Sequence, residues 1–512
     1  MKKRSICLLL AALLTLLAGC AGAAEPAAEG GRELIIGATA GIGGSGLDPA
    51  DGYQGWACIR VGVGETLFRL TDTLEVEPFL VEDYSLSDDH LTWTLTLRED
   101  VTFQNGYPLD AAAAKASLER TVAQNDRAAT DLMLASVEAD GQTLRITTTE
   151  PNPVLPNALC DPYACILDVA RTEDFRYGPV GTGPYRVASV TPDQETVVVP
   201  YEGYWGGQPR LERIRIRTMD KDALTMAMQT GEIDAAYGMA YEGQALFVGD
   251  ERYNMQTVAT SRIYKLYYNF HNEHLANINV RRALNMLVDK EAYGETAMSG
   301  FGAPAVGCFP EDTPYGQGLT ATAFDVDGAL ALLAQEGYAD TDGDGILDLD
   351  GSPLRFRLVT YSSRAELPTL AAAFQSQCRQ AGIDVQVTVS ESADDLLRAD
   401  QFDIAAYAFV TLPTGDPASY LNTVMGADGW SNFGHYESAQ VQALLAQLDS
   451  EFDPDRRAAL AAEIVQTALD DEAYCFMAHL EMSLVTKSTV TGLAPHPSDY
   501  YQVNVATDRL EA

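Results

Sequence analysis

Apolar and polar residues alternate over much of the first third of the chain, at the spacing of half-buried β-strands. The stretch LTWTLTLRED, residues 91–100, places Leu91, Trp93, Leu95 and Leu97 on one face. ELIIGATA, ETLFRL and QTLRITTTE are also predicted as strands. LDAAAAKASLERTVAQ has helical spacing instead, with Asp110 as its expected N-cap.

Strand and helix patterns alternate from residue 211 to the end of the chain. LERIRIRTM is predicted as a strand, KDALTMAMQTG as a helix that ends at Gly231, and EIDAAYG as a strand. The later segments LRFRLVTY, LPTLAAAFQSQCRQAG, IDVQVTVS and SAQVQALLAQLDSEF continue this alternation. The chain is therefore predicted to have an α/β fold with several subdomains.

Two long strands are predicted at SRIYKLYYNF, residues 261–270, and EMSLVTKSTV, residues 481–490. They flank the block 271–480. A second domain inserted between two halves of a first would give this arrangement. Because the chain then crosses twice between domains, we expect a hinge and a ligand cleft between two lobes.

The N-terminus has the pattern of a targeting segment. Three basic residues precede ICLLLAALLTLLA, about 13 apolar-rich residues where a bilayer-spanning helix needs ~20. LLAGC, residues 16–20, resembles the lipobox of bacterial lipoproteins. This predicts a signal peptide at 1–19, lipidation of Cys20 and a flexible tether at 20–32. A cysteine of an ordinary signal peptide is the alternative.

Charge and cysteine content narrow the function further. With 34 basic and 73 acidic residues the net charge is −39, which argues against nucleic-acid partners and anionic lipid surfaces.

Apart from Cys7 and Cys20, six scattered cysteines remain, without a CxxC motif. Cys160 and Cys165 could form a disulfide in an oxidising compartment, but buried free thiols are the favoured interpretation.

No catalytic motif is found. Gly62-Val63-Gly64 lacks the third glycine of a dinucleotide-binding loop, because Leu67 stands in its place. GxSxG, HExxH and Walker A motifs are absent from the sequence. We therefore expect a binding protein that is not an enzyme and requires no cofactor. A secreted hydrolase and a sensor that partners a signalling receptor are the alternatives.

Several motifs, in family order, resemble the family 5 extracellular solute-binding proteins of ABC importers. They are SDDHLTWTLTLREDVTFQNGYPLDAAAAKASLERT, GTGPYRV, YEGYWGGQPRLERIRIR, MAMQTGEIDAAYG, VRRALNMLVDKEAYGETAMSGFG and GDPASYL. The family includes receptors for dipeptides, oligopeptides, nickel and nickel chelates. GWACIRVGVGETLFRL and APHPSDYYQV are most similar to its nickel-binding subgroup.

The resemblance implies a two-lobed periplasmic-binding-protein-like fold of class II with three subdomains. Lobe I would comprise 33–262 and 486–512, with an inserted subdomain at roughly 73–180, and lobe II 263–485. The protein would be a monomer, lipid-anchored outside the cytoplasmic membrane. It would deliver a nickel complex or a short peptide to ABC permease and ATPase subunits.

The same resemblance points to ligand-binding residues at the cleft. It places Tyr53, Trp56 and Arg60 at its lip, where a guanidinium would bind a carboxylate; core packing of Trp56 and a surface role for Arg60 are the alternative. Arg127 matches an arginine that fixes the carboxylate of nickel chelates, or is an exposed helix residue. Asp161 stands where a second such arginine is expected, a departure from the pattern.

Three residues of the second half complete the expected ligand site. Asp416 in GDPASYL matches an aspartate that pairs with the α-amine of peptide ligands, although Asp before Pro is also common in turns. Tyr407 and Trp430 would flank that wall of the cleft, or serve packing instead.

Candidate metal ligands fall into two groups. His496 and His435 are the best candidates for nickel, against the alternative of ordinary surface or core histidines. His271 and His274 in FHNEH lack the i,i+4 spacing of a zincin helix. In DTDGDGILDLDG, Asp340, Asp342, Asp344, the Ile346 carbonyl and Asp348 match an EF-hand-type loop without its final glutamate, which predicts a structural calcium site or an acidic turn.

Overall fold

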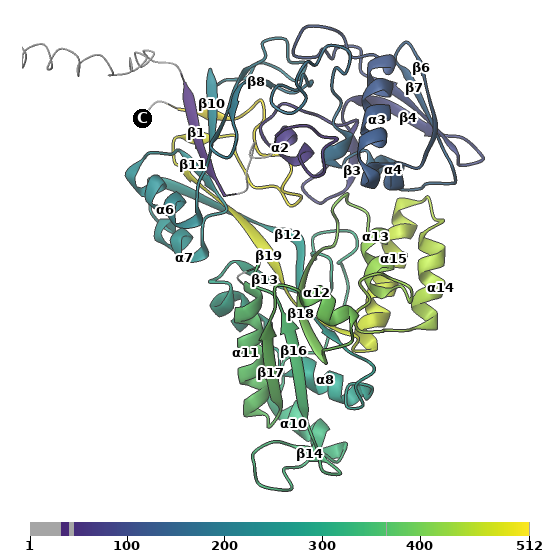
Figure 1. The fold of residues 1–512 in the computed structure, drawn as a ribbon, viewed down its shortest axis with the longest axis vertical. Helices are drawn as coiled ribbons and strands as arrows, with labels where there is room; N and C mark the ends of the chain where they lie inside the picture. The colour runs from purple at the N-terminus through teal and green to yellow at the C-terminus, as the bar shows by residue number, and fades with distance from the viewer. Residues whose placement is uncertain (1–31, 40–45, 365, 511–512) are drawn as a thin grey trace, which may run out of the picture.

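The computed structural model describes residues 32–39, 46–364 and 366–510. The predicted signal peptide, Cys20 and nearly all of the predicted tether lie outside these residues. The described residues form two lobes, upper and lower in Figure 1, joined by two long strands. None of the helices in the described segments combines the length and apolar character needed to cross a bilayer.

One 11-stranded mixed sheet runs through both lobes. In spatial order its main path consists of β17 (Asp384–Val389), β16 (Arg355–Thr360), β18 (Ile404–Val410), β12 (Tyr253–Tyr268), β19 (Tyr474–Lys487), β11 (Ala235–Tyr237), β1 (Glu33–Ala38), β10 (Arg213–Thr218), β9 (Glu195–Pro200) and β8 (Tyr185–Thr191). β13 (Gly302–Pro304) pairs with β19 off this path. Parallel pairs occur between β1 and its two neighbours and between β16 and its two neighbours, whereas the β10, β9 and β8 end of the sheet is antiparallel.

The two connecting strands are β12 and β19, which pair antiparallel from Tyr253 opposite Lys487 to Tyr267 opposite Tyr474. Both begin earlier in the chain than their sequence pattern predicts, at residues 253 and 474 instead of 261 and 481. The reason is that each strand is the other's hydrogen-bonding partner along its length, so the ladder extends through the polar-rich residues 253–260 of β12 and the almost wholly apolar residues 474–480 of β19.

A smaller subdomain of the upper lobe contains a four-stranded antiparallel sheet. Its order is β4 (Val81–Leu86), β5 (Thr92–Leu97), β7 (Thr143–Thr148) and β6 (Leu134–Asp140). The predicted face of β5 is buried at Trp93, Leu95 and Leu97. It packs together with α3 (Ala111–Gln124), whose predicted N-cap Asp110 accepts a hydrogen bond from Ala113 N at 2.8 Å.

The remaining elements follow the predicted alternation of helix and strand. The other helices are α2 (Gly55–Arg60), α4 (Asp126–Leu132), α5 (Leu155–Ala158), α6 (Lys221–Thr230), α7 (Tyr241–Gln244), α8 (Ile278–Met286), α9 (Lys290–Ala292), α10 (Val326–Gln335), α11 (Glu366–Gln380), α12 (Ala393–Arg398), α13 (Ala418–Met425), α14 (Ala439–Leu448) and α15 (Pro454–Asp470). Short helical turns are η1 (Pro162–Ala164), η2 (Ala245–Phe247) and η3 (Tyr293–Ala297). Three two-stranded sheets pair β2 (Phe68–Leu70) with β3 (Val76–Pro78), β14 (Asp348–Leu349) with β15 (Ser352–Pro353), and β20 (Val490–Thr491) with β21 (Asp508–Arg509).

Some local features predicted from the sequence are present in the structure and others are only partly so. The predicted helix at 221–230 ends at Gly231, which takes φ +77°, a left-handed conformation that glycine adopts without a Cβ clash. ETLFRL forms a strand only at Phe68–Leu70, because only these three residues have a partner, the short strand β3. All six cysteines of the described region are buried free thiols, so Cys160 and Cys165 are not bridged.

Candidate functional site

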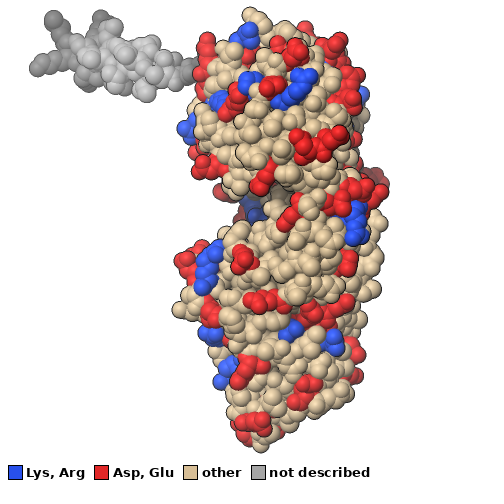
Figure 2. Space-filling view, turned by 90° about the vertical axis from the view of Figure 1, so that its right-hand side faces the viewer, with Lys and Arg blue, Asp and Glu red and all other residues tan. Residues whose placement is uncertain are grey.

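A cavity of about 780 Å³ lies where the two lobes meet. Its lining comes from four parts of the chain: the upper lobe around α2 and α7, the crossing strands β12 and β19, the lower lobe around the start of α11, and the C-terminal segment 497–502. Figure 2 shows the surface hollowed between the lobes, with basic side chains inside the hollow, while acidic groups are spread over both lobes. Its volume suits a small-molecule ligand.

An irregularity in β12 forms part of the cavity wall. The register between β12 and β19 shifts between Ala259 and Ile263, and the intervening residues Thr260, Ser261 and Arg262 all line the cavity. A bulge redirects side chains that a regular strand would place in the ladder. The crossing strands therefore contribute binding groups as well as connecting the lobes.

The helix α2 and the turn before it bring three predicted site residues, Tyr53, Trp56 and Arg60, to this wall. Trp56 contacts Tyr53 edge-on, with ring centroids 5.9 Å apart, and the Arg60 guanidinium lies 5.2 Å from the indole ring. The Trp56 Nε1–H is buried without a hydrogen-bond partner in the described structure. It is therefore a buried donor left unsatisfied beside the cavity.

Arg60 itself is not a free cation. Its Nε donates to the main-chain oxygen of Asp499 at 2.8 Å, and its terminal nitrogen pairs with the Asp499 carboxylate. Burial raises the pKa of Asp499, and the positive charge of Arg60 opposes that rise. Arg60 therefore fixes the C-terminal segment at the cavity, and its guanidinium is largely occupied by this contact.

Arg127, the fourth predicted residue, also lines the cavity. Its guanidinium lies 4.8 Å from the ring centres of both Tyr53 and Tyr163, and it pairs with Asp161 at 2.7 Å. Burial raises the pKa of Asp161 to about 6, although the charge of Arg127 lowers it. The unexpected aspartate at position 161 is thus the counter-ion of Arg127.

Two further arginines line the cavity that the sequence did not single out, Arg262 on β12 and Arg364 just before α11. Neither guanidinium forms a hydrogen bond or ion pair with another residue of the described structure. Burial, together with the charge of Arg364, lowers the pKa of Arg262. Two half-buried cations held near each other, neither of them in a direct ion pair, favour an anionic ligand. A sequence signal exists only for Arg262, which is a charged residue at the start of a predicted apolar strand. There is none for Arg364.

Carboxylates occupy another part of the lining, at Glu242, Glu366 and Glu481. Glu366 accepts a hydrogen bond from the Tyr264 hydroxyl at 3.2 Å. Burial raises the pKa of Glu481, whose carboxylate has no partner in the part of the chain that the structure describes. The cavity therefore offers unpaired groups of both signs.

Three predicted ligand contacts lie outside the cavity lining. The Asp416 carboxylate is buried against Arg457, with contacts of 2.6 and 3.0 Å, so its charge is already compensated. Tyr407 donates to Asp394 at 3.1 Å and packs among other aromatic rings. Trp430 is largely exposed and contacts Phe409 and Arg398. For Tyr407 and Trp430 the packing alternative describes the contacts observed, and Asp416 also accepts a hydrogen bond from Ala418 N at 2.8 Å, as in a turn.

Neither predicted nickel ligand lies in the cavity. His496 lines a second, separate cavity of about 610 Å³ in the upper lobe, where its Nδ1 contacts the Ser498 hydroxyl at 2.7 Å. Burial lowers its pKa to about 4. His435 lies instead beside His271 and Asp400 in the lower lobe. Among the described lining residues of the main cavity there is no histidine or cysteine.

The predicted calcium loop brings some of its acidic groups together. One carboxylate oxygen from each of Asp340, Asp342 and Asp344 lies within 4.8 Å of the others. Asp348 is engaged elsewhere, because it accepts hydrogen bonds from Thr341. The Asp340 carboxylate accepts from the amides of Gly343 and Gly345, as in an acidic turn. Calcium binding there stays a prediction.

Similarity to known proteins agrees with this architecture. The crystal structure of the nickel ABC transporter from Bacillus halodurans is 31% identical, with a TM-score of 0.86, and the match covers 93% of this chain and all of that one. NikA from Staphylococcus aureus in complex with Ni(L-His)2 is 25% identical, with a TM-score of 0.72, covering 94% and 100%. The glutathione-binding protein GsiB of Salmonella paratyphi A is 27% identical, covering 81% and 83%.

A family model matches more than half of the chain. Residues 75–432 match the family described as bacterial extracellular solute-binding proteins, family 5 Middle. This span includes the four-stranded subdomain, the crossing strand β12 and the lower lobe through α13, whereas the crossing strand β19 lies beyond it. The chain belongs to the family 5 bacterial extracellular solute-binding proteins.

Proposed function

We propose that this protein captures a small, carboxylate-bearing ligand in the interlobe cavity for uptake by an ABC importer. The observation that carries the proposal is the pair of arginines, Arg262 and Arg364, that line one cavity with neither guanidinium in an ion pair within the described residues. A carboxylate would be bound there by charge-assisted hydrogen bonds. Glu481, also unpaired, would receive a cationic or hydrogen-bond-donating part of the same ligand.

A nickel complex that carries its own chelator is the favoured ligand. Nickel bound by the protein alone would need nitrogen or sulfur donors, and the described cavity lining contains no imidazole or thiolate. Two relatives are a nickel transporter component and a NikA that holds Ni(L-His)2. In such a complex, the arginines would bind the carboxylates of the chelator while its own atoms hold the metal.

A short peptide is the second candidate. GsiB is a glutathione-binding protein, and a peptide also presents a carboxylate to the two arginines. Asp416, which would have paired with a peptide α-amine, is turned to Arg457 instead. A peptide amine would therefore have to be bound by Glu481 or Glu242.

Delivery would follow from closure of the lobes. A ligand that contacts both lobes stabilises the closed form over the open one, and we propose lobe boundaries near residues 262 and 485, where β12 and β19 cross. The closed monomer would dock on permease subunits, held outside the membrane by lipid at Cys20. We assign no catalytic step to any residue, and ATP hydrolysis would take place in a partner subunit.

Native mass spectrometry of the purified protein tests the proposal. The expected result is one bound nickel complex after incubation with Ni²⁺ and L-histidine, together with a more compact form in small-angle scattering. A co-purifying mixture of peptides without metal would overturn the nickel assignment. Scattering curves and calorimetry that respond to neither class of ligand would overturn the binding function.

A further inference from the structure

Two histidines and one aspartate from three separate segments meet at the lower lobe. His271 follows β12, Asp400 lies between α12 and β18, and His435 lies in the loop between α13 and α14. His271 and Asp400 are exposed and His435 is half-buried. From Arg262 in the cavity wall, β12 continues for six more residues to Tyr268, or ~20 Å of strand. The cluster is therefore separate from the interlobe cavity.

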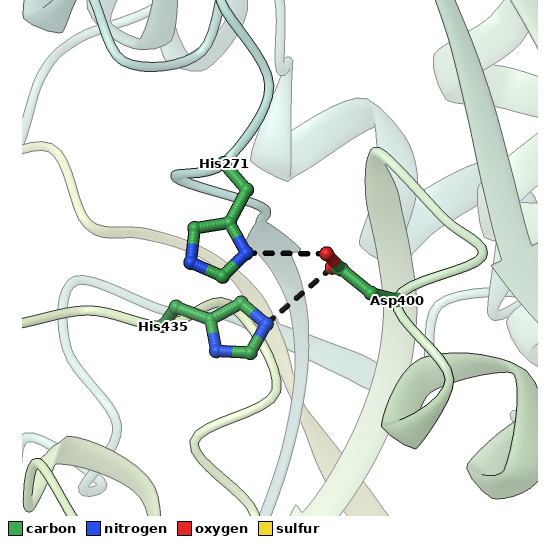
Figure 3. Close-up of side chains that lie close together, drawn as sticks. All are labelled: His271, Asp400 and His435. Atoms are coloured by element: carbon green, nitrogen blue, oxygen red, sulfur yellow. Dashed lines mark hydrogen bonds and ion pairs between the residues drawn. The ribbon is translucent and has the colours of Figure 1, made fainter.

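The three side chains converge on one point. His271 Nδ1 lies 3.1 Å from Asp400 Oδ2, and His435 Nε2 lies 3.4 Å from Asp400 Oδ1. The two imidazole rings are stacked, with centroids 4.0 Å apart and an angle of 16° between their planes. Figure 3 shows one nitrogen of each ring facing the carboxylate.

The three side chains are close enough to share one metal ion. Zinc binds histidine nitrogen and carboxylate oxygen at about 2.0–2.1 Å, so two of its ligand atoms lie ~3.3 Å apart. Each imidazole nitrogen lies 3.1 or 3.4 Å from a different oxygen of Asp400, and one ligand atom from each of the three residues lies within 4.8 Å of the others. Three protein ligands would leave a fourth position for water.

Neighbouring residues affect the solvent access and orientation of the ligand atoms in this cluster. His435 Nε2 is shielded from solvent and makes no hydrogen bond within the described structure, and its contact with Asp400 is an ion-pair distance of 3.4 Å. Asn269 Nδ2 donates to Asp400 Oδ1 at 2.6 Å and orients the carboxylate, as outer-shell groups of metal sites do. Arg357 interacts electrostatically with Asp400, but its guanidinium is paired with Asp403 at 3.0 Å.

The geometry points to a surface site for a divalent transition-metal ion, formed by His271, Asp400 and His435 and distinct from the cargo cavity. Two imidazoles and one carboxylate suit Zn²⁺ or Ni²⁺ and not Ca²⁺, which prefers oxygen ligands. A bound ion would tie together three loops of the lower lobe. Since it binds the folded state, it would raise the thermal stability of the protein.

Equilibrium dialysis of the EDTA-treated protein against Zn²⁺, with metal quantified by mass spectrometry, tests this site. The double variant H271N/H435N is expected to bind one Zn²⁺ fewer than the wild type, and D400N to bind that ion at least tenfold more weakly. Asparagine is chosen because His435 and Asp400 both have φ +58°, a left-handed conformation that asparagine tolerates. H90N, at an exposed histidine of the upper lobe that also has positive φ, is the matched control.

A second readout separates this site from the cavity. Zn²⁺ should raise the melting temperature of the wild type, of H90N and of the cavity variant R262Q/R364Q, but not that of H271N/H435N. Equal Zn²⁺ content in the wild type and H271N/H435N would overturn the proposal, as would binding of Ca²⁺ but not Zn²⁺ by the wild type. Loss of the Zn²⁺ from R262Q/R364Q would assign it to the cavity instead.

Discussion

Arg60 and Asp499, 439 positions apart in the chain, hold each other at the wall of the interlobe cavity. The guanidinium donates to both the main-chain oxygen and the carboxylate of Asp499. Since Trp56 packs against the same guanidinium, this one contact positions the helix α2 and the C-terminal segment together.

Replacing Arg60 with methionine is expected to lower the free energy of unfolding by ~2 kcal/mol, because charged hydrogen bonds to a partly buried carboxylate are lost. Urea denaturation followed by circular dichroism measures the change. R69M is a suitable control, because Arg69 pairs with Glu77 at the surface and its loss should cost at most ~0.5 kcal/mol. Equal effects of the two substitutions would contradict the positioning role of Arg60.

The unpaired arginines should determine ligand affinity. R262Q and R364Q are each expected to weaken binding of the nickel–histidine complex by ~10–100-fold, since each removes a charge-assisted hydrogen bond to a carboxylate. Isothermal titration calorimetry measures the affinities. R252Q is the control, because Arg252 pairs with Asp250 outside the cavity. Unchanged affinity in both cavity variants would place the ligand elsewhere.

Glu65 should make stability depend on pH. It is buried and accepts hydrogen bonds from Thr182, Tyr204 and Trp205, and burial raises its pKa from 4.5 to about 7. The folded state therefore holds this proton more tightly than the unfolded state. The stability that it contributes is complete below pH 4.5 and is lost as pH rises through about 7, a change of ~3 kcal/mol.

The substitution E65Q, which cannot ionise, isolates this effect. Relative to E65Q, the wild type should lose free energy of unfolding between pH 4.5 and 7.5, as measured by urea denaturation at each pH. Parallel stability curves for the two proteins across that range would show that Glu65 does not titrate there.

Gly183 in the GTGPYRV motif has a packing role that alanine cannot fill. A Cβ there would lie 2.4 Å from the Gly62 oxygen and 2.9 Å from the Val63 oxygen. G183A should therefore destabilise the protein by ~3 kcal/mol through backbone displacement. G178A is the matched control, since its Cβ would lie 3.6 Å from the nearest atom, an ordinary contact. Similar melting temperatures for the two variants would refute the close packing.

The elements that could be predicted from the sequence are those set by neighbouring residues. Asp110 caps α3 and Gly231 ends α6, because cap geometry depends on residues within one turn. The α/β class and the family followed from motifs in order along the chain. Tyr53, Trp56 and Arg60 could be located as a group, since they lie on or just before one short helix.

The features that could not be predicted from the sequence depend on contacts between segments far apart in the chain. From the sequence, Asp416 was predicted to bind a ligand amine, but in the fold it pairs with Arg457. Asp161 stands where an arginine was expected, and in the fold it pairs with Arg127. In each case local sequence fixes the charge of a side chain, but not whether that charge is already compensated.

The sequence by itself therefore determined the fold class, the caps, the family and one wall of the cavity, because these rest on short-range geometry and ordered motifs. Only the tertiary structure decided which charged groups at the cavity lack an ion-pair partner among the described residues, Arg262, Arg364 and Glu481 among them, and that His271, Asp400 and His435 lie together. The reason is physical: chain folding brings together groups whose separation in sequence carries no information about their distance in space.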